Sequence, residues 1–252
     1  MSRVGSAPAV HLSYHTMIMS ITERVHLARE RIARAAERAG RSPQDVRILA
    51  ATKGRSVAEI LEALKAGIDL IGENTVQEAL GKFEFLPQEL EKHMIGTLQL
   101  NKVKAAVKLF HAIQSVDSWE LARALDRELS RIEREEPYSI FLEVNPAGEE
   151  TKRGLPPDQV EPLIEQIQDL QNVRVVGLMA MMPYQDPETL RPHFRAMREL
   201  FEHLHQQARQ KGWARVEMRW LSMGMSHDFE VAVEEGANLV RLGTVLFGPR
   251  EA

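Results

Sequence analysis

Residues 46–54 read VRILAATKG, a continuous apolar run that ends at Lys53 and Gly54. A helical pattern begins just beyond this run, near Ser56. A short strand that is apolar on both of its faces is typical of a parallel sheet covered on both sides by helices. This first strand therefore predicts an α/β fold in which strands and helices alternate along the chain.

Seven further strand candidates follow, each separated from the next by an amphipathic helical pattern. They are 69–74, 93–96, 112–117, 139–145, 173–180, 219–225 and 239–248. The helical patterns cover 57–66, 76–83, 102–110, 119–131, 158–170, 188–210 and 229–235. Eight strands with alternating helices predict a single (β/α)8 TIM barrel. An open, doubly wound sheet is the alternative that the same pattern allows.

A capped helix before the first strand favours the barrel. Ser20 and Glu23 form an S-x-x-E capping box, apolar residues repeat at spacings of four and three as far as Ala39, and Gly40 follows. Only residues 249–252 come after the eighth strand candidate, so we expect this N-terminal helix to replace the missing eighth helix. Residues 20–252 would then form one domain, and residues 1–19 a disordered or non-native extension.

The composition excludes several classes of site. A net charge of −4 and a pI of about 6.2 argue against a nucleic-acid partner. The absence of cysteine excludes disulfides, thiolate zinc sites and cysteine nucleophiles. The nine histidines show no metal-ligand spacing, so no metal is expected. No apolar run reaches membrane-spanning length and no signal-like apolar core is present, which predicts a cytoplasmic protein without a membrane partner.

Lys53 stands at the carboxyl end of the first strand among small and apolar neighbours. An amine in such a place can be partly desolvated, which lowers its pKa and frees it to condense with a carbonyl group. The alternative interpretation is a lysine that merely begins a surface loop. Polar residues, among them Asn74, also stand at the ends of the other strands, where barrels build their active sites.

Small and hydroxyl residues gather after the last two strand candidates. They are Ser222, Gly224 and Ser226 in LSMGMSHDFE (221–230), with Gly243 and Thr244 beside Arg241 in RLGT (241–244). Small residues let backbone N–H groups approach an anion closely, and a helix N-terminus adds a favourable dipole. The alternative is that Ser226 only caps a helix and Gly224 only makes a turn. A lysine after strand one and a phosphate site after strands seven and eight suggest a phosphorylated aldehyde as ligand.

A series of motifs covers essentially everything from residue 20 onward. It comprises ATKGRS (51–56), IGENTVQE (71–78), HMIGTLQLNK (93–102), IQSVD (113–117), VNPAGEETKRG (144–154), GLMAMMP (177–183), LSMGMSHDFE (221–230) and VRLGTVLFG (240–248). In this order the motifs closely resemble the pyridoxal phosphate homeostasis proteins, the YggS/PROSC family. The resemblance implies a single (β/α)8 barrel, like the N-terminal domain of alanine racemase, that binds pyridoxal 5′-phosphate (PLP).

The resemblance also implies roles for individual residues. Lys53 would be the lysine that forms the Schiff base (aldimine), and Asn74 would lie beside the cofactor. Ser222, Gly224, Ser226, Gly243 and Thr244 would hold the phosphate. Arg241 would contact either the phosphate or the pyridine nitrogen. Independently of the resemblance, Met179 is most simply explained as barrel filling, although its place near a strand end could let it line a ring-shaped ligand.

The leading interpretation is a protein that holds, buffers and delivers PLP without catalytic turnover, with apo PLP-dependent enzymes as candidate partners and no catalytic residue assigned. The alternatives are a PLP-dependent amino-acid racemase and a class I aldolase that uses Lys53. Fold relatives that racemise amino acids carry an additional β-domain and a residue from a partner subunit, which this sequence does not supply. An aldolase would need a second lysine or carboxylate, and the candidates Glu143 and Asp117 belong to no assigned role. A pure interaction module would leave the polar strand ends unexplained.

Overall fold

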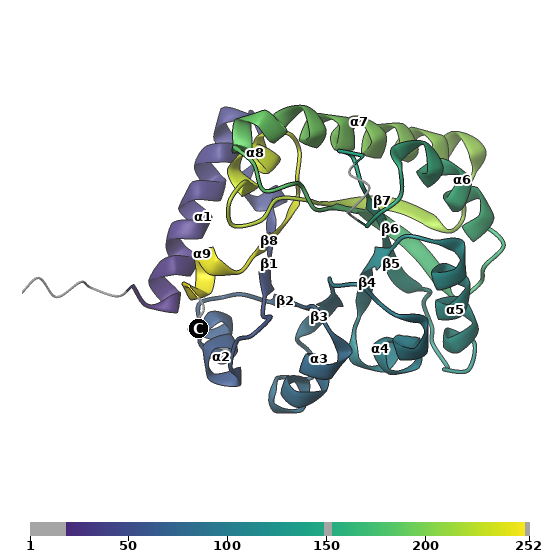
Figure 1. Ribbon diagram of the computed structural model, residues 1–252, viewed down its shortest axis with the longest axis horizontal. Coiled ribbons are helices and arrows are strands. Elements are labelled where there is room, and N and C mark those ends of the chain that lie inside the picture. Colours follow the sequence, from purple (N-terminus) through teal and green to yellow (C-terminus); the bar gives the residue numbers. More distant parts are fainter. Residues whose placement is uncertain (1–18, 149–152, 250–252) are drawn as a thin grey trace, which may run out of the picture.

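The computed structural model describes residues 19–148 and 153–249, which form a closed barrel of eight parallel strands surrounded by helices (Figure 1). The strands follow one another in chain order around the barrel, and the last pairs with the first through Arg47↔Leu239 to Ala50↔Leu242. The predicted (β/α)8 barrel is therefore confirmed, and the open-sheet alternative is wrong. The predicted extension 1–19 lies outside the described residues, except for Met19.

The eight strands are short and mostly buried. They are β1 (Arg47–Ala51), β2 (Leu70–Glu73), β3 (Glu91–Met94), β4 (Ala112–Val116), β5 (Tyr138–Val144), β6 (Val173–Ala180), β7 (Val216–Ser222) and β8 (Leu239–Leu242). The last strand is much shorter than the predicted 239–248. It stops because the backbone turns at Gly243, and Thr244–Phe247 then form the short helix α9 instead of continuing the strand.

Helices follow the strands as the periodicity predicted. They are α1 (Ile21–Arg38), α2 (Val57–Lys65), α3 (Val76–Lys82), α4 (Val103–Leu109), α5 (Trp119–Leu129), α6 (Pro157–Ile167), α7 (Pro187–Lys211), α8 (Phe229–Glu234) and α9 (Thr244–Phe247), with 3-10 turns η1 (Pro43–Asp45), η2 (Phe83–Phe85) and η3 (Leu100–Lys102). The capping box at Ser20 is present, and Ser56 forms another at α2. Within the described residues, none of these helices is long and apolar enough to span a membrane.

Helix α1 packs against α2, α8 and α9, where it covers the junction of β8 and β1 (Figure 1). Its buried face carries Val25, Ala28 and Ile32, with further alanines toward its C-terminal end. The Arg31 guanidinium binds the Glu230 carboxylate of α8 at 2.8 Å. The prediction that the N-terminal helix takes the place of an eighth helix is confirmed, because β8 and β1 meet directly beneath it.

The interior of the barrel is not purely apolar. Leu49, Phe141 and Met179 belong to an apolar cluster inside it. Beside that cluster lie buried polar side chains of non-neighbouring strands, including Gln114 of β4 and Ser222 of β7, which bond to each other at 2.7 Å. A contact between β4 and β7 has to cross the interior, since these strands are not adjacent in the barrel. This polar layer forms a support beneath the carboxyl ends of the strands.

Candidate functional site

A cavity of about 290 Å³ lies at the carboxyl ends of the strands, where barrel enzymes build their sites. Its wall includes six of the residues predicted from the sequence. They are Lys53 after β1, Asn74 after β2, Ser226 after β7, Arg241 on β8, and Gly243 and Thr244 after β8. Because β8, β1 and β2 are neighbours, their loops meet at one edge of the barrel mouth. The fold therefore brings these residues together from positions almost 200 residues apart.

Lys53 is exposed at the open side of this cavity. The sequence had predicted an amine partly desolvated by small and apolar neighbours. The structure contradicts this part of the prediction, because neighbours as small as Ala51 and Gly54 do not reach over a lysine side chain. The position of Lys53 at the strand end is as predicted. Its neighbours Ala51 and Gly54, however, do not shield its amine from solvent.

The loop that carries Lys53 is held by a partly buried ionic cluster. The Lys82 ammonium donates to the Thr52 carbonyl at 2.9 Å, to Glu73 at 2.8 Å and to Glu78 at 2.9 Å. The Thr52 hydroxyl donates to Glu73 at 2.9 Å, and the Gly54 amide donates to Glu78 at 3.0 Å. Both chain neighbours of Lys53 are thus fixed, which fixes the base of its side chain.

The two carboxylates of this cluster are shifted in opposite directions. Burial raises the pKa of Glu73, although hydrogen bonds from Lys82 and the Asn74 amide oppose the rise. Burial also acts to raise the pKa of Glu78, but bonds from Lys82 and the Gly54 amide outweigh it and lower the pKa to about 2. Sequence reasoning did not identify Lys82 or Glu78, because their role depends on the turn of α3 back toward β1.

Two backbone amides near the start of α9 converge on one oxygen. The Ser226 hydroxyl oxygen accepts hydrogen bonds from the amides of Gly243 and Val245, both at 3.2 Å. Two amides that share an acceptor form a concave donor site of the kind that binds oxyanions. The preceding turn depends on Gly224, because its φ is +93° and an added Cβ would lie 2.6 Å from the Cβ of Ala232.

Arg241 is a buried cation anchored on the β6–β7 side of the cavity. Its guanidinium donates to the Ser222 carbonyl at 2.8 Å, to the Ser222 hydroxyl at 2.9 Å and to the Ala180 carbonyl at 2.8 Å. Burial lowers its pKa to about 10, while Asp228 and Glu143 act in the opposite sense, so it stays protonated at neutral pH. The described residues on the cavity wall include Lys53, Arg55 and Arg241 and no carboxylate, which favours an anionic ligand.

Three predicted site residues lie behind the wall rather than on it. Met179 is fully buried in the apolar cluster inside the barrel, and Ser222 is fully buried with its hydroxyl bonded to Gln114 and Arg241. The Gly224 carbonyl accepts from the Arg241 amide. The structure thus assigns the Ser222 side chain to the support of Arg241, whereas the sequence had predicted a direct contact with phosphate.

Several wall residues were not singled out from the sequence. They are Ala51, Arg55, Ile95, Met181, Tyr184, Met225 and His227. Tyr184 is 87% exposed and stacks on His227, with ring centroids 4.5 Å apart. Each of these residues lies close to the carboxyl end of a strand, so position alone could have indicated them. Because many residues lie near strand ends, this position alone, without a sequence motif, is weak evidence that a residue lines the cavity.

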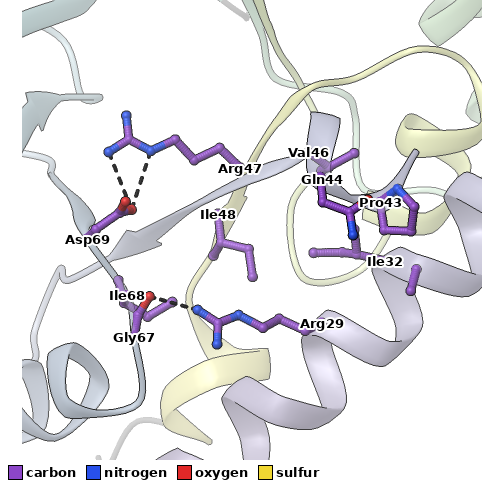
Figure 2. Close-up of a pocket in the computed structure, with 11 residues that line it drawn as sticks. Arg29, Ile32, Pro43, Gln44, Val46, Arg47, Ile48, Gly67, Ile68 and Asp69 are labelled. Carbon is purple, nitrogen blue, oxygen red and sulfur yellow. Dashed lines mark hydrogen bonds and ion pairs between the residues drawn. The ribbon is translucent and has the colours of Figure 1, made fainter. Parts of the chain in front are cut away.

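A second cavity, of about 410 Å³, lies at the other end of the barrel between α1 and the loop before β2 (Figure 2). Its polar groups are already paired. Arg29 donates to the Gly67 carbonyl at 2.7 Å, and Arg47 pairs with Asp69 at 3.3 Å. Although it is larger, it lacks the convergent lysine and amides of the first cavity. Among the described residues, no group of three or more His, Asp or Glu side chains could hold a metal ion.

Comparison with known proteins identifies relatives of this chain. Residues 27–251 match the family model described as the alanine racemase N-terminal domain. A pyridoxal phosphate homeostasis protein of Aquifex aeolicus is 43% identical over 235 residues, which make up 92% of this chain and 100% of that protein.

Two solved structures extend the comparison. PipY of Synechococcus elongatus, solved with PLP bound, has a TM-score of 0.76 and 35% identity over 91% of this chain and 100% of its own. An alanine racemase of Clostridium difficile shares the fold with a TM-score of 0.67 at 14% identity, over 91% of this chain and 57% of that enzyme. The chain therefore belongs to the alanine racemase N-terminal domain family and, within it, to the pyridoxal phosphate homeostasis proteins.

Proposed function

We propose that this protein binds PLP in the cavity at the carboxyl ends of the strands, covalently linked to Lys53, and that it serves PLP homeostasis by holding and releasing the cofactor without turnover. One observation carries the proposal. A single cavity combines the amine of Lys53 with Ser226, Gly243 and Thr244, and the Ser226 hydroxyl accepts from the amides of Gly243 and Val245. The names of the relatives and the PLP bound to PipY support the same ligand.

The groups of this cavity match the chemical parts of PLP. The phosphate suits the amides after β8 together with the hydroxyls of Ser226 and Thr244, and the aldehyde suits the amine of Lys53. Ile95 and Met181 offer apolar surface to a ring, and Asn74 offers an amide at its edge. The volume of about 290 Å³ is close to the lower end of small-molecule sites, which start at about 300 Å³.

For Arg241 we propose the ring nitrogen rather than the phosphate as partner. Its guanidinium is tied to carbonyls of β6 and β7, whereas the phosphate donors lie in the loops after β7 and β8. When bound, PLP supplies an electron sink, and that sink is strongest with a protonated ring nitrogen. A fixed guanidinium beside this nitrogen disfavours its protonation. The arrangement therefore fits a protein that stores PLP better than one that uses it for carbanion chemistry.

The racemase alternative requires a second acid or base besides Lys53. On the described wall, the other side chains that could pass a proton are Tyr184 and His227, and both lie at the exposed rim, stacked on each other. No observation places either of them over a reacting carbon. The aldolase alternative requires a second lysine or carboxylate in the cavity. Its candidates, Glu143 and Asp117, are not among the wall residues.

Borohydride reduction of the PLP-loaded protein tests the proposal directly. We expect the reduced label on Lys53 after peptide mapping by mass spectrometry, because Lys53 is the lysine of the cavity wall. Lys53→Ala should lose the label but keep weaker, phosphate-dependent binding. Lys104→Ala on α4 is the matched control and should be labelled like the unchanged protein. A label on another lysine, or no label, contradicts the assignment of Lys53.

A further inference from the structure

A continuous line of buried hydrogen bonds crosses the barrel interior from the cavity to the opposite end. The Arg241 guanidinium contacts the Ser222 hydroxyl at 2.9 Å, and this hydroxyl contacts the Gln114 side-chain carbonyl at 2.7 Å. The Gln114 amide nitrogen lies 2.9 Å from Nδ1 of His93. Each of these four side chains is buried. No role was assigned to His93 or to Gln114 from the sequence.

The line ends in an ion pair at the amino end of the barrel. Nε2 of His93 lies 2.8 Å from one carboxylate oxygen of Glu91. The other oxygen of Glu91 accepts from Arg47 at 2.6 Å. Hydrogen bonds from His93 and Arg47, together with the Arg47 charge, lower the pKa of Glu91 against the effect of burial. The ionised Glu91 carboxylate is therefore the final acceptor of this series of hydrogen bonds, at the end opposite to Arg241.

The two end groups limit the directions of the bonds between them. A guanidinium can only donate and a carboxylate can only accept. In the structure Ser222 accepts from Arg241 and donates to the side-chain oxygen of Gln114, so the Gln114 amide nitrogen faces Nδ1 of His93 and donates to it. With this orientation of Gln114, His93 accepts at Nδ1 and donates from Nε2 to Glu91. This arrangement satisfies all the groups with a neutral imidazole, and burial lowers the pKa of His93 in the same sense.

We infer that Gln114 and His93 are positioning residues that hold Arg241 in place through Ser222. This inference rests on the proposed function only in taking PLP as the ligand that Arg241 faces. An arginine side chain has many rotamers, and a serine hydroxyl can rotate between acceptors. The bond to Gln114 restricts rotation of the Ser222 hydroxyl. The bond to His93 in turn restricts rotation of the Gln114 amide. The position of the cation is thus set by residues that do not line the cavity.

The tautomer of His93 can be measured without any ligand. Long-range ¹⁵N–¹H NMR spectra of the full-length protein should show His93 as the neutral Nε2–H form at pH 7. Gln114→Leu removes the donor to Nδ1, so the spectrum of His93 should change in that variant. A His93 that carries its proton on Nδ1, or that is charged at pH 7 in the unchanged protein, overturns the inference, whether or not PLP binds.

PLP affinity measures the effect on Arg241. We expect Gln114→Leu to weaken PLP binding about tenfold, which corresponds to about 1.4 kcal/mol. In an Arg241→Gln background the same change should have little further effect, because the residue being positioned is gone. The matched control is Tyr138→Phe, which removes the buried bond of the Tyr138 hydroxyl to the Phe110 carbonyl (2.8 Å) outside the line. It should lower stability and leave PLP affinity unchanged.

Gln114→Glu covers the case in which Gln114→Leu does not fold. A carboxylate of the same shape still accepts from Ser222, so the anchor of Arg241 and the PLP affinity should stay close to those of the unchanged protein. At the other end it requires a proton on Nδ1 of His93, and the NMR spectrum should then show a charged imidazole. A folded Gln114→Leu with unchanged affinity, or equal losses with and without Arg241, overturns the inference. Failure of the unchanged protein to bind PLP instead refutes the proposed function and leaves the NMR result standing.

Discussion

Lys82 holds the loop that carries Lys53, although it does not line the cavity. Its ammonium is the cation beside the fully buried Glu73 carboxylate. Removing one partner of a buried ion pair leaves an uncompensated charge, which typically costs about 3–5 kcal/mol. We therefore expect Lys82→Met to lower the free energy of unfolding by about 3 kcal/mol and to slow the labelling of Lys53. Denaturant unfolding checks this, with Lys65→Met at an exposed position of α2 as the control that should stay within about 0.5 kcal/mol.

Glu143 gives the protein a pH-dependent stability. It is buried at the end of β5, and burial together with the nearby Asp117 raises its pKa from 4.5 to about 7, against the opposing charge of Arg241. The folded state then binds this proton more tightly than the unfolded chain. Stability therefore falls as the pH rises from 4.5 to about 7, and the full penalty, at most about 3 kcal/mol, applies above that window.

Replacing Glu143 by Gln removes this titration. Glu143→Gln should be more stable than the unchanged protein at pH 8 and should show a flatter stability profile between pH 4.5 and 7. Denaturant unfolding at several pH values measures both. Parallel profiles for the two proteins would mean that Glu143 titrates normally, and would contradict the prediction.

At the residue scale, the motifs correctly predicted cavity residues whose position is set by the backbone, that is, by the end of a strand. Gly243 directly follows β8 and Lys53 lies two residues after β1, so their place at the barrel mouth depends on where those strands end. The position of Ser222 could not be predicted in this way. Its hydroxyl bonds to Gln114 across the barrel, and a contact between non-adjacent strands leaves no periodic signal in the sequence. The solvent exposure of Lys53 was also not predicted. The size of the residues next to it in sequence does not determine which side chains pack over it in the folded protein.

The alanines of α1 allow this helix to lie close to its neighbours. Ala28, Ala35 and Ala36 are fully buried against the surrounding elements. A larger side chain at such a site forces shifts that typically cost about 1–3 kcal/mol. We expect Ala28→Leu to lower the melting temperature accordingly, measured by calorimetry. The same change at the exposed Ala58 of α2 is the control and should be nearly neutral. Equal stability of the two variants would argue that α1 is only loosely attached.

At the element scale, periodicity and caps predicted most boundaries. The capping box of Ser20 located the start of α1, and the strand candidate 173–180 coincides with β6. The largest error was the eighth strand, predicted as 239–248. Its apolar composition continues to Phe247, but Gly243 leaves the extended conformation and the amides that follow turn inward, toward Ser226. Composition could not reveal this, because a short buried helix and a buried strand share the same apolar pattern.

At the scale of the whole molecule, the barrel alone does not decide between storage and catalysis. An alanine racemase has the same fold, but at 14% identity, and the match covers 57% of that enzyme. Fold similarity at this level says nothing about chemistry. The decision therefore depends on the number and placement of proton-transferring groups around the cavity.

Hydrogen exchange with amino acids makes this decision experimentally. Racemisation needs a base on one face of the bound amino acid and an acid on the other. Lys53 can serve one face, whereas Tyr184 and His227 stack on each other at the exposed rim. In the position proposed above, Arg241 would also disfavour a protonated ring nitrogen. We expect negligible exchange of the α-proton when the PLP-loaded protein is incubated with a panel of L-amino acids in D2O and followed by NMR. Transfer of PLP to an apo PLP-dependent enzyme should be measurable under the same conditions. Tyr184→Phe is the matched variant: rapid exchange that this substitution abolishes would make Tyr184 the second acid and would replace the storage proposal by the racemase alternative.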